Sequence, residues 1–106
     1  MRLSTTIASA LLATMINAAP SLAATIAVTI SNYTFIPATI SVHPGDTVIW
    51  TNQDSIPHTA TSIDGKTFDS GAIDPGDSWK FEFSKTGKFD YRCSIHPDMH
   101  GTINVQ

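Results

Sequence analysis

Short runs in which apolar and polar residues alternate recur along residues 25–105. The clearest run is 77–83, where Trp79, Phe81 and Phe83 fall on one side of an extended chain and charged residues stand between them. A period of two predicts a β-strand with one buried face. No stretch of useful length repeats at helical spacing, so the pattern predicts an all-β domain.

The same pattern predicts eight short strands, separated by turn residues such as Pro, Gly, Asp and Asn. They cover residues 25–30, 33–35, 39–42, 47–52, 59–62, 77–83, 87–92 and 101–105. Residues 64–76 are rich in Gly, Asp and Pro and are predicted to form a loop. Seven or eight short strands in about 80 residues favour an antiparallel Greek-key β-sandwich, with a small barrel as the alternative.

The N-terminal segment has the features of a secretory signal peptide. Arg2 supplies the basic start, residues 3–16 are apolar, and Ser21-Leu22-Ala23 resembles a cleavage site. The apolar run is too short for a stable membrane span, although an anchor or a buried helix is the competing interpretation. We therefore expect a signal peptide over 1–23, with cleavage after Ala24 also possible, and a soluble periplasmic domain over 24–106.

Removal of that segment leaves five basic against nine acidic residues, a net charge of −4. A negative domain is a poor match for nucleic acid and for anionic lipid surfaces. We therefore expect neither a nucleic-acid partner nor membrane insertion.

The chain contains one cysteine, Cys93, so no disulfide can form within it. Small exported domains often need disulfides because their cores are small, and a bound metal is a common substitute. An unpaired thiol in an oxidising compartment is oxidised unless it is buried or bound to a metal. The single cysteine therefore indicates that Cys93 has a chemical role, for which a metal is one candidate.

Cys93, His96 and Met99 lie three residues apart, between a predicted strand and Gly101. A tight loop can direct a thiolate, an imidazole and a thioether toward one point. Zinc sites rarely use Met, whereas soft sulfur ligands favour copper. A trigonal plane of two His and one Cys with a weak axial Met is the arrangement of electron-transfer copper sites.

This arrangement requires a second histidine, and His43, His58 and His100 are the candidates. His58 lies where a loop meets a strand, so the topology of a sandwich can bring it to the end where Cys93 lies. His43 lies in a Pro-Gly turn expected at the opposite end, and His100 is adjacent to Met99 and points elsewhere. The argument favours His58.

The chain also resembles the cupredoxins, most of all the amicyanins and their plastocyanin and pseudoazurin relatives. The resemblance covers nearly all of residues 24–106 and includes the two-residue spacing between His96 and Met99. It is carried by the following pattern: Phe35-x-Pro37-x-x-Ile40-x-Val42-x-x-Gly45-Asp46-x-Val48-x-Trp50-x-Asn52, followed by Phe89-Asp90-Tyr91-x-Cys93.

The resemblance implies a type 1 copper protein that is not an enzyme and that carries single electrons between redox partners. Copper would be bound by His58, Cys93, His96 and Met99. His96 would be the electron port, within an apolar patch. Transient partners would be a c-type cytochrome or a periplasmic dehydrogenase, and we expect a monomer. Thr59 would tie the His58 segment to the Cys93 segment.

Three alternatives remain at this point. A copper carrier or buffer would use the same ligands but would release its metal readily. A thiol enzyme would use Cys93 as nucleophile and His58 or His96 as base, although Met99 would then have no role. A metal-free structural sandwich would use none of these side chains for chemistry.

Overall fold

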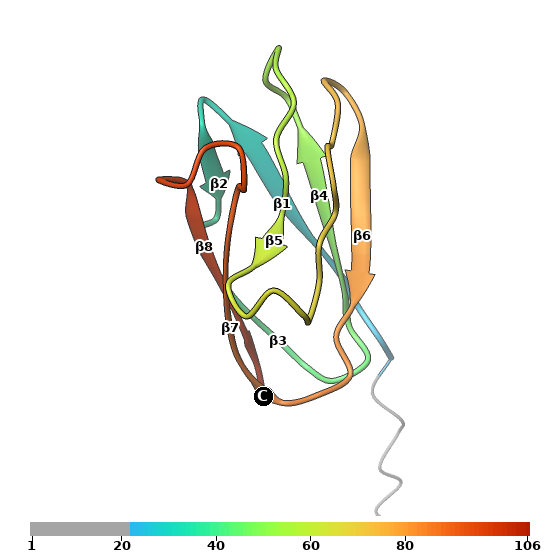
Figure 1. Ribbon diagram of the computed structural model, residues 1–106. Helices are drawn as coiled ribbons and strands as arrows, with labels where there is room; N and C mark the ends of the chain where they lie inside the picture. Colours follow the sequence, from blue (N-terminus) through green and yellow to red (C-terminus); the bar gives the residue numbers. More distant parts are fainter. Residues whose placement is uncertain (1–21) are drawn as a thin grey trace, which may run out of the picture.

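The computed structural model describes residues 22–106, which fold into two facing four-stranded sheets (Figure 1). Eight strands and no helix occur in this part of the chain, which confirms the predicted all-β sandwich. The strands are β1 (Thr25–Ser31), β2 (Thr34–Ile36), β3 (Thr39–Val42), β4 (Thr47–Asn52), β5 (Thr61–Ser62), β6 (Ser78–Glu82), β7 (Gly87–Arg92) and β8 (His100–Val105).

One sheet has the strand order β2-β1-β4-β6 and the other has β3-β8-β7-β5. The sheets are not purely antiparallel as predicted, because β1 pairs with β4 and β3 pairs with β8 in parallel. The chain leaves the first sheet after β2 and forms β3 in the second sheet. It then returns to the first sheet as β4, which runs in the same direction as β1. The other strand pairs are antiparallel.

The predicted signal peptide lies almost wholly outside the described residues and stays a prediction. Within residues 22–106 the structure contains no helix that could cross a membrane.

Several predicted strand boundaries differ from the observed ones, and two of these differences fall near the candidate ligands. Tyr33 belongs to the turn before β2, with a φ of 58°. Residues 59 and 60 precede β5, because their N–H groups bind side chains in place of a neighbouring strand. The Thr59 N–H donates to Cys93 Sγ over 3.3 Å, and the Ala60 N–H donates to Ser70 Oγ over 2.7 Å.

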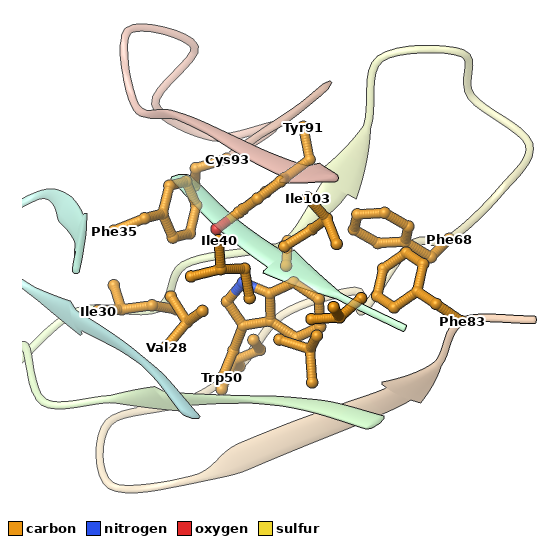
Figure 2. Close-up of a cluster of buried hydrophobic side chains, with 14 of the residues drawn as sticks. Val28, Ile30, Phe35, Ile40, Trp50, Phe68, Phe83, Tyr91, Cys93 and Ile103 are labelled. Atoms are coloured by element: carbon orange, nitrogen blue, oxygen red, sulfur yellow. The ribbon is translucent and has the colours of Figure 1, made fainter. Parts of the chain in front are cut away.

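The core lies between the sheets and is rich in aromatic rings (Figure 2). Trp50 from β4 and Tyr91 from β7 meet edge to face, with ring centroids 5.5 Å apart. Phe35 packs on Tyr91 at 4.6 Å. Phe68 and Ile73 enter this core from the predicted loop 64–76, whose composition gave no sign that it contributes buried side chains.

Three connections gather at one end of the sandwich: the β1–β2 turn, the β4–β5 segment and the β7–β8 loop (Figure 1). The turn between β3 and β4 lies at the other end, as the sequence predicted for His43. The fold therefore brings together segments that are far apart in the sequence.

Candidate metal centre

Cys93 is buried by the same alternation that buries Tyr91, since both residues point inward from β7 and its continuation (Figure 2). The loop that follows is closed by two backbone hydrogen bonds. The Cys93 N–H donates to the Met99 carbonyl over 3.2 Å, and the Met99 N–H donates to the His96 carbonyl over 3.0 Å. These bonds hold the three sequence-predicted residues of this loop in one compact turn.

His58 lies in the irregular segment between β4 and β5 and is anchored by its own backbone. Its N–H and carbonyl both bond to Ile73, at 3.2 and 2.7 Å. Its Nε2 lies 2.8 Å from a carboxylate oxygen of Asp54. With Nε2 donating to that carboxylate, Nδ1 carries the lone pair that a metal requires.

Asn52 supports the same segment from the end of β4. Its buried side-chain amide donates to the carbonyls of Ile56 and Ile73, at 2.7 and 2.9 Å. Its side-chain oxygen accepts the N–H of Asp54 over 2.9 Å. Asn52 therefore links the end of β4 to the loop that holds His58.

His58, Cys93 and His96 form one cluster, with a ligand atom of each within 4.8 Å of the others. The Cys93 sulfur lies 3.7 Å from His58 Nδ1 and 3.6 Å from His96 Nδ1. His58 and Cys93 are 0% exposed, whereas His96 is half-buried. The structure therefore brings the three predicted equatorial residues together, with His96 alone reaching the surface.

The spacing of these atoms fits a shared metal ion. Nitrogen and thiolate ligands bind first-row metals at about 2.0–2.3 Å, so three such atoms in a plane around one ion lie roughly 3.5–4 Å apart. The two sulfur–nitrogen distances fall in that range. Met99 is 4% exposed and ends the same loop, where its thioether is available as a soft fourth ligand. This donor set is that of a type 1 copper site.

The remaining histidines are outside the cluster. The side chain of His43 is 80% exposed at the far end of the sandwich, 3.8 Å from Asp46. His100 is exposed at the start of β8. The preference for His58 over these two residues agrees with the geometry.

Thr59 joins the two segments that contribute the cluster, as the resemblance implied. Its hydroxyl oxygen accepts the N–H of Ser94 over 2.7 Å and donates to the Ser94 hydroxyl over 3.1 Å. Its own N–H donates to the Cys93 sulfur. Thr59 thereby ties the His58 segment both to the Cys93 sulfur and to the next residue of its loop.

Two further residues contact the cluster, and the sequence analysis missed both. Tyr33 stands edge-on to His58 and to His96, with ring centroids 5.3 and 5.0 Å away. Asp54 accepts the N–H groups of Tyr33 and Asn32, and these bonds together with its contact to His58 hold the pKa of its carboxyl below the usual value. The available signal was Asn32 at the start of a two-residue hairpin turn.

The neighbours of His96 in its loop are mostly apolar, although Asp98 adds one charged side chain to the pocket beside this ring. Ile95 is 52% exposed, Pro57 and Pro97 are exposed, and Ile56 is half-buried. Met99 is buried and adds little to this surface. A shallow pocket beside His96 is lined by residues of the β7–β8 loop and by Tyr33.

The profile of the cupredoxin-like domain matches residues 4–105. The chain belongs to the cupredoxin-like family. Amicyanin of Paracoccus denitrificans is 30% identical over 71 residues, which cover 63% of this cupredoxin and 54% of the amicyanin. The chain thus spans about half the length of that relative. Plastocyanin of Scenedesmus fuscus is 32% identical over 85 residues, which cover 68% of this chain and 86% of the plastocyanin.

The fold is shared with solved cupredoxin structures. A purple cupredoxin from Nitrosopumilus maritimus superposes with a TM-score of 0.71 at 31% identity, covering 76% of this chain and 99% of the other. The family membership and the geometry of the cluster agree, because the gathered side chains are those that a cupredoxin uses for copper.

Proposed function

We propose that this cupredoxin is an exported electron carrier with one type 1 copper ion, bound by His58, Cys93, His96 and Met99. It passes single electrons between redox partners and catalyses no reaction of its own. The observation that carries the proposal is the unequal burial of the cluster: His58, Cys93 and Met99 are at most 4% exposed, and His96 alone is half-buried.

Each side chain has a distinct role in this proposal. The Cys93 thiolate would supply the strongest bond to copper, His58 and His96 would bind it through imidazole nitrogens, and Met99 would add a weak thioether ligand. The bound copper supplies the one-electron Cu(II)/Cu(I) couple. A hydrogen bond from the Thr59 N–H draws charge from the sulfur and favours the reduced state.

A rigid site suits this role because electron transfer is fast when the ligands move little between oxidation states. The His58 backbone is fixed to Ile73, and Cys93 is fixed by backbone bonds to Met99 and from Thr59. These bonds hold the ligands in one geometry that both oxidation states tolerate.

The partner surface is the apolar rim of His96. A small apolar contact with little charge steering suits a complex that forms briefly and separates quickly. A c-type cytochrome or a periplasmic dehydrogenase fits this description, and the carrier acts as a monomer in the periplasm after removal of residues 1–23. Nucleic acid and membrane insertion have no part in this role.

The test is the spectrum of the purified domain after addition of Cu(II). We expect an intense blue band in visible absorption and a narrow parallel hyperfine splitting in electron spin resonance. Cys93→Ser and His58→Gln should abolish this signature, while the matched variants His43→Gln and His100→Gln should retain it. A colourless wild-type protein, or an unchanged spectrum in Cys93→Ser, would overturn the proposal.

A copper buffer would give the same spectrum, so a second measurement separates the two functions. We expect an electron carrier to keep its blue band through repeated cycles of reduction and reoxidation in the presence of a competing chelator. Rapid transfer of the metal to that chelator would favour the buffer.

A further inference from the structure

The turn between β1 and β2 consists of Asn32 and Tyr33, and both residues have left-handed backbone angles. Their φ values are 54° and 58°. Two-residue hairpins of this kind favour Asn followed by Gly, because glycine has no Cβ to clash. Tyrosine at the second position is therefore an unfavourable choice for the backbone, and its side chain requires another explanation.

The strained turn is fixed to the metal centre by a single carboxylate. Asp54 Oδ1 accepts the N–H of Asn32 over 2.6 Å, and Oδ2 accepts the N–H of Tyr33 over 2.9 Å. The same Oδ2 lies 2.8 Å from His58 Nε2. The position of the Tyr33 backbone is thus coupled to that of a ligand.

The ring of Tyr33 lies across both imidazoles. It is nearly perpendicular to each, at 82° to His58 and 84° to His96, and the two imidazoles lie 5.0 Å apart. Tyr33 remains 52% exposed, so its ring does not belong to the core. The ring instead packs against the two imidazoles and covers them on the side that faces solvent.

We propose that Tyr33 is a positioning residue that restrains His58 and His96 and slows the release of bound copper. This inference rests on the proposed function, because it assumes that the cluster binds copper. His96 is the half-buried ligand and the one from which release begins. A ring packed against it limits its rotation away from the metal and limits access of competing ligands.

The experiment compares release of Cu(I) from the loaded, full domain to an excess of a chromogenic Cu(I) chelator. Loss of groups that orient metal ligands typically weakens metal binding about 10–100-fold, so we expect Tyr33→Gly to release copper at least about tenfold faster than wild type. Tyr33→Phe retains the ring and should release at the wild-type rate. Ile63→Ala, at an equally exposed apolar residue outside the centre, should do the same.

Two further readouts separate this role from a general effect on folding. Glycine relieves the left-handed backbone, so Tyr33→Gly should keep the unfolding midpoint of the metal-free domain at or above the wild-type value. Tyr33→Asn is a second ring-free variant whose residue type also tolerates this backbone. In nuclear magnetic resonance spectra of the metal-free domain, the His58 and His96 ring protons should shift when the tyrosine ring is removed.

Release at the wild-type rate from Tyr33→Gly and Tyr33→Asn would overturn the inference while leaving the copper site intact. Faster release from both variants together with lowered unfolding midpoints would also overturn it, because the effect would then be structural. A wild-type domain that takes up no copper would overturn the proposed function and this inference with it.

Discussion

The backbone N–H of Thr59 donates to the sulfur of Cys93 over 3.3 Å, although the two residues are 34 positions apart in the sequence. The adjacent Thr59 hydroxyl accepts the N–H of Ser94 over 2.7 Å. One residue therefore satisfies the sulfur and the loop behind it. The relative position of His58 and Cys93 depends on this contact between the segments that contain them.

Thr59→Val tests the side-chain part of that contact. Valine keeps the shape but leaves the Ser94 N–H without its acceptor, and an unsatisfied donor in this partly buried position costs roughly 1–3 kcal/mol. We expect the free energy of unfolding of the metal-free domain to fall by that amount in denaturant titration. Thr51→Val, the same substitution at an exposed hydrogen bond to the Ser78 hydroxyl, should cost less. Equal losses in the two variants would contradict the assignment.

Gly101→Ala tests the packing of Tyr91 against β8. Gly101 pairs with Tyr91, and a Cβ at this position would lie 2.3 Å from the Cζ atom of the tyrosine ring. Displacement of a buried ring by an added methyl group typically costs about 1–3 kcal/mol. We expect that loss in the free energy of unfolding, together with a shifted copper spectrum, because Tyr91 is two residues from Cys93.

Asn104→Ala supplies the matched control for Gly101→Ala, since it changes an outward-facing residue of the same strand. A surface change of this kind stays within about 0.5 kcal/mol. Wild-type stability of Gly101→Ala would show that the ring moves without cost.

The hydrogen bonds that Asp46 accepts predict that the stability of the domain depends on pH. Its carboxylate accepts the N–H groups of Ala24 and His43, at 2.9 and 2.8 Å, and these bonds hold its pKa below the usual value. The folded state therefore favours the ionised form. The resulting stabilisation is present above the unfolded pKa, about 4, and is lost as the pH falls through the lower folded pKa.

We expect Asp46→Asn to lower the unfolding midpoint at pH 7 and to flatten the decline of that midpoint as the pH falls below about 5. Asp74→Asn, at an exposed carboxylate, should leave the wild-type profile in place. Parallel acid profiles for wild type and Asp46→Asn would contradict the prediction.

The predicted cleavage site gives Ala24 a further role. When the chain begins at Ala24, its backbone nitrogen becomes an ammonium group, and this nitrogen lies 2.9 Å from Asp46 Oδ1. We expect a domain that starts at Ala24 to have a higher unfolding midpoint than one that starts at Thr25, with a difference that shrinks in high salt. The same comparison in Asp46→Asn isolates the ion pair, and an unchanged difference there would exclude it.

The strands were predictable from the alternation of apolar and polar residues. Cys93, His96 and Met99 were predictable from their residue types and their spacing. Alternation predicts which face of β7 is buried, and Cys93 continues that alternation. The spacing of Cys93, His96 and Met99 indicates one tight loop, and soft donors indicate copper. The choice of His58 required only the expectation that the ends of neighbouring strands meet.

Asn32 signals a turn before β2, but no local pattern placed Tyr33 against the metal centre, because alternation suggested an extended residue there. Its left-handed conformation depends on the Asp54 carboxylate, which lies 21 positions away in the sequence. The contribution of loop 64–76 to the core was missed for a similar reason. Phe68 and Ile73 are buried, but no periodic pattern surrounds them in the sequence. Contacts between irregular segments have no local sequence signal.

The bonds between the backbones of His58 and Ile73 have a consequence for how the proposed carrier could be modified. His58 is the buried ligand, and its position is fixed by Ile73 in the loop 64–76. This loop does not line the pocket beside His96. In the proposed carrier, substitutions in residues 64–76 would therefore shift the redox potential without changing the surface around His96. Substitutions at Ile95, which is 52% exposed beside His96, would act first on partner recognition, so the two properties would have separate origins in the structure.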